Sequence, residues 1–215
     1  MPPRAAEAGG RADNGKSREE EFLRAALDLF AERNFASVTI KDIAEALNVN
    51  TALIYYYFEN KTDLFGATIE FAVENAFANM RAIEEASDDP AELLAAWLQN
   101  HVDKYAEIHS FVKIALDHKG SHDGDARIEA SIAKFYARER ELLTKMVRRG
   151  MDQRVFNTID SGRMAQFIST YLDGCMVRSV ILPDFNLKAA VGDLQKLVLD
   201  KLGYKSKKGP RRRKL

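Results

Sequence analysis

Apolar residues recur at intervals of three and four along nearly the whole sequence between Arg18 and Gly203. No stretch shows the sustained alternation of apolar and polar residues that marks a half-buried strand. The pattern is that of amphipathic helices, which bury one face and expose the other. We therefore expect an all-α fold. Because 46% of the 215 residues are hydrophobic, the chain can bury one good core or two small ones.

Helix caps and turn-forming residues divide this pattern into about nine helices. Four fall within residues 18–86, and five more are expected at about 89–105, 107–118, 124–151, 160–182 and 187–202. The clear breaks are "KGSHDGD" and "LPDFN", where Gly, Pro and Asp gather.

Two of the early helices are short and well delimited. Thr39 is a good N-cap for the second helix, with Asp42 at its third helical position. That helix ends at Asn48-Val49-Asn50, where Asn48 tolerates the left-handed backbone of a tight turn and Asn50 caps the third helix. Two short helices joined by a four-residue turn, behind a supporting first helix, make a helix-turn-helix unit.

The third helix carries three consecutive tyrosines, in "TALIYYYFENK". If Ile54 and Phe58 point into the core, the opposite face points outward. That outward face holds Thr51, Ala52, Tyr55 and Tyr56, with Tyr57 at its edge. Small side chains in the first turn permit close approach to base edges in the major groove, and tyrosine hydroxyls can reach phosphate oxygens. The alternative is that the tyrosines are half-buried packing residues.

Lys61 lies in the first turn of the fourth helix, where a cation faces the positive end of the helix dipole. A DNA phosphate at that position would satisfy both the ammonium charge and the free backbone amides of the helix. Thr39 offers the same kind of anchor at the start of the second helix. The alternative is that Lys61 is solvated.

Residues from about 20 to 66 resemble the tetracycline-repressor (TetR) family of bacterial transcription regulators. The family pattern appears as "NVNTALIYYYFENKTDLF", and the preceding helix "TIKDIAEAL" also fits. The resemblance implies a three-helix DNA-binding domain followed by a helical effector-binding and dimerisation domain. Matched residue by residue, it implies DNA contacts for Thr39, Lys41, Thr51, Ala52, Tyr55, Tyr56, Tyr57 and Lys61.

The chain departs from the family at the turn, where Asn48 and Asn50 stand in place of the usual Gly and Ser. Both asparagines can perform the backbone role, so the fold is retained. Asn50 is a further DNA-contact candidate, whose bond to a phosphate or base can differ from that of the family, and the operator can differ accordingly.

Composition separates the two ends from the rest. Residues 1–17 contain Pro and Gly and are expected to be an unstructured arm. Residues 201–215 hold eight basic and no acidic side chains, so 24 of the 32 basic residues and all 32 acidic ones lie in 1–200. We expect 204–215 to be a disordered basic tail that either adds nonspecific phosphate contacts or only aids solubility. The domains in between are expected at 18–66, which binds DNA, and 67–203, which binds the effector and dimerises.

Inward-facing aromatic and methionine side chains of the second domain would suit a small, largely apolar effector, although such stripes are also ordinary core. The pocket candidates are Trp97, His101, Tyr105, Phe111, Phe135, Glu139, Met146, Phe167 and Tyr171. Helix 160–182 is apolar on more than one side, as expected where two subunits meet. The interface candidates, from this helix and the next, are Ile168, Leu172, Val191, Leu194 and Val198.

Other classes of protein are disfavoured. One cysteine, Cys175, cannot form an intramolecular disulfide, and no apolar run approaches the ~18 residues that span a bilayer, so we expect a cytoplasmic protein. The four histidines show no metal-ligand pattern, and there is no phosphate loop or nucleophile elbow, so neither a metal, a cofactor nor an enzyme is expected.

We therefore expect a homodimeric transcription regulator, most simply a repressor of a palindromic operator that a small effector releases. The alternative is an architectural or partner-recruiting DNA-binding protein without a small effector.

Overall fold

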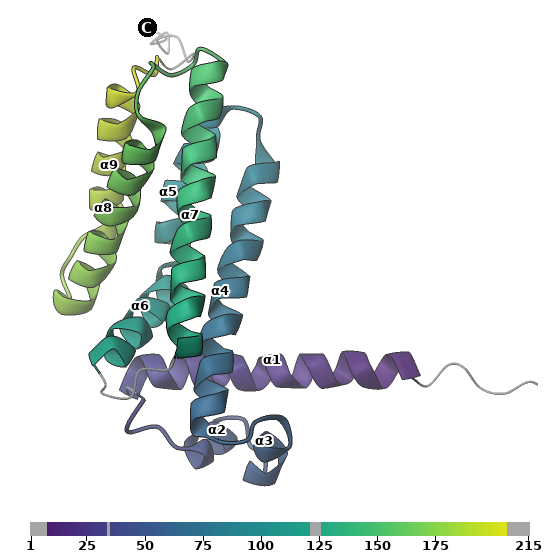
Figure 1. Cartoon of the computed structure of the whole chain (residues 1–215). Helices are drawn as coiled ribbons and strands as arrows, with labels where there is room; N and C mark the ends of the chain where they lie inside the picture. The colour runs from purple at the N-terminus through teal and green to yellow at the C-terminus, as the bar shows by residue number, and fades with distance from the viewer. Residues whose placement is uncertain (1–7, 34, 121–125, 206–215) are drawn as a thin grey trace, which may run out of the picture. The chain divides into compact units, whose positions relative to one another are not determined.

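The computed structural model describes residues 8–33, 35–120 and 126–205, with side chains described at 17–33, 35–116 and 126–205. Every regular element in these ranges is a helix, which confirms the expected all-α class with about nine helices. The helices are α1 (Ala8–Arg33), α2 (Ile40–Ala46), α3 (Thr51–Tyr57), α4 (Lys61–Ala86), α5 (Pro90–Asp103), α6 (Tyr105–Gly120), α7 (Ala126–Asp152), α8 (Ser161–Ile181) and α9 (Leu187–Lys201) (Figure 1).

The chain divides into two compact units. Unit 1 comprises Met1–Phe77 and Ala106–Lys134, and unit 2 comprises Ala78–Tyr105 and Phe135–Leu215. This division differs from the expected boundary at residue 66, because α4 and α7 each contribute residues to both units.

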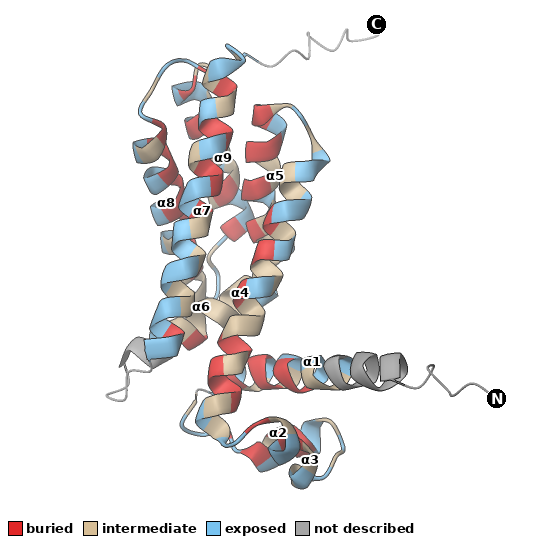
Figure 2. Ribbon diagram, turned by 45° about the vertical axis from the view of Figure 1, so that its right-hand side comes forward, coloured by how far each residue is buried: buried red, intermediate tan, exposed pale blue. Residues whose placement is uncertain are grey.

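Unit 1 is built on an aromatic and aliphatic core shared by its first four helices. Phe22, Ile43, Ile54 and Leu64, one from each of these helices, have no exposed surface. α2 contacts both α1 and α3, and α2 and α3 lie side by side in Figures 1 and 2. Full burial of a large apolar side chain stabilises a fold by about 1.5–3 kcal/mol, so this core fixes the short helices that would not persist alone.

Unit 2 has a separate core, in which α9 packs against both α5 and α8. Figure 2 shows α8 with buried residues on one side and exposed residues on the other. The five residues expected at a subunit interface lie on the buried side and in the facing part of α9. Their exposed fractions are 0% for Ile168, 1% for Leu172, 2% for Val191, 1% for Leu194 and 0% for Val198. All five are buried in the core of their own chain and leave little surface for a second copy, and their assignment to a subunit interface stays a prediction.

Both ends of the chain carry more structure than expected. α1 begins at Ala8, so residues 8–17 of the expected arm are helical. The three glycines in this stretch cost about 1 kcal/mol each relative to alanine but do not forbid a helix, and the prolines lie earlier, at positions 2 and 3. At the other end Gly203 closes α9 with φ 68°, and Tyr204 packs edge-on against Phe156 at 6.2 Å. Residues 206–215 of the expected tail, and 1–7 of the arm, lie outside the described ranges.

Candidate functional site

The N-terminus of α2 is held by a reciprocal capping box. The Asp42 amide donates to Thr39 Oγ1 at 3.1 Å, and the Thr39 amide donates to Asp42 Oδ2 at 2.7 Å. The Thr39 hydroxyl also donates to Asp42 Oδ2 at 2.6 Å, and these bonds hold the pKa of the Asp42 carboxyl below its usual value. The cap expected from the sequence is confirmed, and it leaves Thr39 exposed at the start of the helix.

The turn between α2 and α3 forms as the two asparagines predict. Asn48 adopts φ 52°, and the following Val49 amide donates to the Ala44 carbonyl at 2.9 Å. Asn50 then caps α3, with its Oδ1 accepting from the Ala52 amide at 2.8 Å. Because Asn50 Oδ1 is already bound to this amide, a DNA contact by Asn50 would fall to its side-chain NH2 group.

α3 presents two of its three tyrosines to solvent. Ile54 is fully buried and Phe58 is 4% exposed, whereas Tyr55 is 56% and Tyr56 is 81% exposed. Ala52 is exposed and Thr51 is half-buried in the first turn. Two large aromatic side chains on the outside of a seven-residue helix lose apolar burial, which points to a surface that contacts something else.

Tyr57 differs from its neighbours. Its ring lies edge-on to that of Phe22 in α1, with centroids 5.5 Å apart, and edge-on to that of Tyr56 at 5.2 Å. Tyr57 therefore packs α3 against α1, and its ring contacts that of the exposed Tyr56. The packing alternative considered for the tyrosines describes Tyr57, and it does not describe Tyr55 or Tyr56.

Lys61 is neither solvated nor turned wholly outward. Its Nζ donates to the Phe35 carbonyl at 2.8 Å and to the Val38 carbonyl at 3.0 Å, and it lies 4.2 Å from the centroid of the Phe35 ring. Partial burial lowers the pKa of this ammonium. The side chain ties the start of α4 to the segment between α1 and α2. Sequence reasoning missed this contact because the partners are backbone carbonyls more than 20 residues away. Lys41, by contrast, is exposed, with its Nζ 3.3 Å from Glu45.

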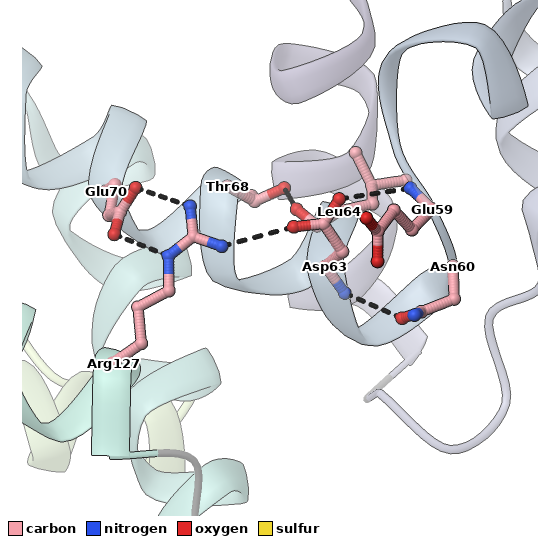
Figure 3. A network of polar contacts seen from close by, with 7 residues as sticks. All are labelled: Glu59, Asn60, Asp63, Leu64, Thr68, Glu70 and Arg127. Carbon is pink, nitrogen blue, oxygen red and sulfur yellow. Dashed lines mark hydrogen bonds and ion pairs between the residues drawn. The ribbon is translucent and has the colours of Figure 1, made fainter.

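A further group that the sequence did not indicate joins α4 to the start of α7 within unit 1 (Figure 3). Arg127 donates two parallel bonds to the Glu70 carboxylate, Nε to Oε1 at 2.6 Å and Nη2 to Oε2 at 2.7 Å. Its Nη1 donates to Asp63 Oδ1 at 3.2 Å. The carboxylates raise the pKa of the guanidinium, chiefly through the hydrogen bonds that Glu70 accepts. Asp63 and Glu70 lie seven residues apart on α4, but Arg127 is 64 and 57 residues from them, too far for any local pattern to relate it to the two carboxylates.

The effector-pocket candidates separate into different surroundings. Trp97 and His101 are buried in α5, 3% and 6% exposed, with ring centroids 5.1 Å apart. His101 Nδ1 lies 3.0 Å from the Trp97 carbonyl, and burial lowers the pKa of His101 to about 4, so the ring is neutral at pH 7. The Trp97 Nε1–H is buried without a partner among the described residues.

Glu139 and Asp173 form a second polar group, between α7 and α8. Ser169 Oγ donates to Glu139 Oε2 at 2.6 Å, and Tyr136 donates to Asp173 at 3.2 Å. Glu139 is 3% exposed, and burial, with a smaller effect from Asp173, raises its pKa to about 7. His101 and Glu139, both candidates for the effector pocket, thus have different partners.

The remaining pocket candidates are scattered. Met146 is buried and Tyr105 and Phe135 are half-buried in unit 2, while Phe111 packs against the core of unit 1. Phe167 and Tyr171 lie on the open side of α8, 42% and 37% exposed. These two lie on the surface of the chain and do not line its core. The sequence could not show this, because a helical wheel shows that α8 has two apolar stripes but not which of them faces inward.

An open groove of about 700 Å³ runs along this exposed side of α8 and α9. Phe167 and Leu197, the latter 54% exposed, form its apolar part. Its remaining lining residues are Met164, Asp193, Lys196, Asp200 and Lys201. Acidic and basic side chains thus alternate along the rim of an apolar surface.

No helix in the described part of the chain has the length and apolar content to cross a membrane. Within the same ranges, no three His, Cys, Asp or Glu side chains are grouped so that they can hold a metal ion.

Residues 22–68 match the model of a family described as bacterial regulatory proteins, tetR family. Among curated proteins, the chain is 28% identical over 116 residues to the HTH-type transcriptional repressor KstR2 of Rhodococcus jostii, which covers 54% of this chain and 55% of the repressor. It is 25% identical over 165 residues to the nucleoid occlusion factor SlmA of Marinobacter nauticus, covering 76% and 84%. The chain thus spans about half the length of its KstR2 relative and most of its SlmA relative.

Two solved structures have the same fold. A TetR transcription regulator from Haloarcula marismortui superposes with a TM-score of 0.74 at 21% identity, over 87% of this chain and 97% of that one. A putative transcriptional regulator from Saccharomonospora viridis, solved in complex with choline, gives a TM-score of 0.76 at 21% identity, over 85% and 96%. At these identities the likeness concerns the fold.

Proposed function

Because this chain belongs to the tetR family of bacterial regulatory proteins, we propose that it is a DNA-binding transcriptional regulator that represses the promoter it occupies. The observation that carries the proposal is the outward face of α3. Tyr55 and Tyr56 are exposed on a helix that is capped at its start and buried along its other side at Ile54. A helix of that kind can enter the major groove without rearrangement. We propose that it acts in the bacterial cytoplasm.

The residues of this surface take different roles in the proposal. Thr51 and Ala52 approach base edges, where a thymine methyl group can meet their small side chains. Tyr55 and Tyr56 reach phosphates on either side of the groove, and Thr39 and Lys41 reach a phosphate at the start of α2. These contacts fix the protein on the duplex, and the first turn of α3 selects the sequence.

Three further residues support the same surface. The Lys61 ammonium has three N–H donors and uses two on backbone carbonyls, so one remains to meet a phosphate. Tyr57 holds the ring of Tyr56 in place. Asn50 keeps α3 capped while its side-chain NH2 group remains a donor for a phosphate or base.

A second copy of the chain is proposed to cover the exposed side of α8 and α9. The large apolar side chains of Phe167, Tyr171 and Leu197 are exposed together on unit 2. A contiguous exposed apolar patch of this kind is typical of a surface that contacts another protein. Gly174 lies on this side of α8, and a Cβ added to it would meet no described atom within 4 Å, so close approach by another helix explains the glycine. The alternating charges at Asp193, Lys196, Asp200 and Lys201 can pair with their counterparts across a two-fold axis.

Two-fold symmetry of the protein requires two-fold symmetry of the operator, so an inverted repeat is expected. Release by a small, largely apolar effector completes the proposal. Trp97 and His101 support it, because an indole N–H with no partner among the described residues and a neutral imidazole are polar groups that can orient such a molecule among apolar side chains. A coupling of about 1–3 kcal/mol between effector and DNA changes DNA affinity roughly 5–150-fold.

The test is selection of genomic fragments by the purified full-length protein, followed by sequencing of the retained DNA. Recovery of an inverted repeat beside a small number of promoters supports the regulator. Retention of DNA without such a repeat favours the architectural alternative, to which the SlmA relative lends weight by its name. Failure to retain any DNA overturns the proposal.

A further inference from the structure

Arg127 lies in the first turn of α7, outside the matched residues 22–68, yet it binds α4 near the helix-turn-helix. Its guanidinium donates two parallel hydrogen bonds of 2.6 and 2.7 Å to Glu70 and a third of 3.2 Å to Asp63 (Figure 3). All three residues belong to unit 1. A planar guanidinium can serve two carboxylates at once in a fixed geometry, which the single ammonium of a lysine cannot do.

The bond to Asp63 leads on to the end of the proposed recognition helix. Asp63 Oδ1 accepts from Arg127, and its other oxygen, Oδ2, accepts from the Glu59 amide at 3.1 Å. The Asp63 amide in turn donates to Asn60 Oδ1 at 2.9 Å. Glu59 and Asn60 form the turn between α3 and α4, so the Asp63 side chain joins Arg127 directly to the turn that sets the direction of α3.

We infer that Arg127 is a positioning residue for DNA recognition, which fixes the α3–α4 turn through Asp63 and thereby the angle at which α3 leaves α4. The inference rests on the proposed function. Arg127 makes no contact with DNA in this scheme. It restrains the turn between α3 and α4, one of the two turns that hold the helix of Tyr55 and Tyr56, and a small change in that turn moves both side chains together.

The chain supplies a matched control in the same two helices. Lys134, also in α7, pairs with Glu74 of α4 at 3.1 Å, and both side chains are more than half exposed. This pair links the same helices with the same charges, but among the described residues neither Lys134 nor Glu74 has a hydrogen bond or ion pair with the α3–α4 turn. Lys134→Met therefore removes a pair between α7 and α4 and leaves the chain of bonds through Asp63 intact.

Hydrogen exchange of the Glu59 amide in the free protein tests the restraint without DNA. Arg127→Met is expected to accelerate exchange of this amide about tenfold, because Asp63 loses the partner that holds it, while amides in the core of α1 keep their rates. Arg127→Lys is expected to fall between, and Lys134→Met to leave Glu59 unchanged. If Arg127→Met does not fold, Glu70→Gln loosens the same guanidinium without touching Asp63. Unchanged exchange of Glu59 in the folded variants, or equal acceleration in Lys134→Met, overturns the inference.

The second readout is affinity for the inverted repeat selected by the wild-type protein, compared with a random duplex of equal length. Arg127→Met is expected to weaken binding to the repeat about three- to tenfold, with partial recovery in Arg127→Lys and little change for the random duplex. Equal affinities of Arg127→Met and wild type for the repeat overturn the role in recognition. If the wild-type protein retains no DNA at all, the proposed function fails, and Glu59 exchange still decides whether Arg127 fixes the turn.

Discussion

The ammonium of Lys61 does two things that a surface lysine does not. It holds the segment between α1 and α2 by donating hydrogen bonds to the Phe35 and Val38 carbonyls, and it makes a cation–π contact with the Phe35 ring. We expect Lys61→Met to lower the free energy of unfolding by about 1–3 kcal/mol, since hydrogen bonds from a charged donor are lost and two carbonyls lose a partner. Thermal or denaturant unfolding measures the change.

Lys41→Met is the control for Lys61, because the Lys41 side chain is 78% exposed and its pair with Glu45 is solvated. Its effect on stability is expected to stay within about 0.5 kcal/mol. Both variants are expected to weaken DNA binding if both lysines meet phosphates. Equal stabilities of the two variants would show that the carbonyl contacts of Lys61 contribute nothing to the fold.

Glu139 makes the stability of the protein depend on pH. Its carboxyl ionises near 4.5 in the unfolded chain and near 7 in the folded one, because burial disfavours the charge. Between these values the folded protein keeps a proton that the unfolded chain releases, so rising pH favours unfolding. Glu139→Gln removes this effect and keeps an acceptor for Ser169. The variant is expected to gain stability relative to wild type as pH rises from about 4.5 to 7, reaching about 2–3 kcal/mol at about pH 8.

The difference between the two proteins is the quantity to measure, because His101 acts in the opposite direction. Burial lowers the pKa of His101 from 6.5 to about 4, so falling pH through that window favours the unfolded chain. Asp173, whose pKa burial also raises, adds to the effect of Glu139. His101 and Asp173 are present in both proteins, and their contributions largely cancel in the comparison. Parallel pH profiles for wild type and Glu139→Gln would contradict the buried neutral carboxyl.

At the scale of elements, helix ends were predictable where short-range chemistry decides them. Thr39 and Asn50 cap their helices as expected, and Asn48 takes the left-handed conformation. Which face of a helix turns inward was less predictable. α8 has two apolar stripes, and only the packing of α9 shows that Ile168 is inside and Phe167 outside.

The end of α7 offers a test of packing between a helix and the loop that follows. A Cβ added at Gly150 would overlap the ring of Phe156, which is 5% exposed and folds back over the helix. We therefore expect Gly150→Ala to destabilise the protein by about 1–3 kcal/mol, because the ring must leave its site. Denaturant unfolding monitored by circular dichroism measures it.

Gly192 in α9 is the matched position, since an added Cβ there meets nothing within 4 Å. Gly192→Ala is expected to be neutral or to stabilise by up to about 1 kcal/mol, through the better helix propensity of alanine. If Gly150→Ala behaved like Gly192→Ala, Phe156 would not be packed against the helix in solution.

At the scale of the whole molecule, the contacts that organise the proposed DNA-binding surface come from distant parts of the chain. Arg127 meets Asp63 and Glu70 across more than 50 residues, and Lys61 reaches back to Phe35. Sequence periodicity predicts where helices are but not which charged side chains meet once they pack. The exposure of Tyr55 and Tyr56 was therefore predictable from α3 alone, whereas the residues that hold α3 in place were not.

Leu197 tests whether two copies join through the exposed side of α8 and α9. It is 54% exposed and lines the groove there, so Leu197→Glu leaves the core of the chain intact while placing a charge on the proposed interface. We expect the variant to be monomeric at concentrations where wild type is a dimer, as measured by sedimentation equilibrium. Because a monomer binds one half-site at a time, its affinity for the full inverted repeat is expected to fall about 10²-fold or more, with its affinity for a single half-site unchanged.

Leu116→Glu is the control for Leu197→Glu, since Leu116 is a similarly exposed leucine, at 48%, on α6 in the other unit. It is expected to remain dimeric and to keep its affinity for the repeat. A dimeric Leu197→Glu would move the interface to another surface. A monomeric Leu197→Glu that still binds the full repeat as tightly as wild type would mean that DNA itself, and not the α8–α9 surface, brings the two copies together.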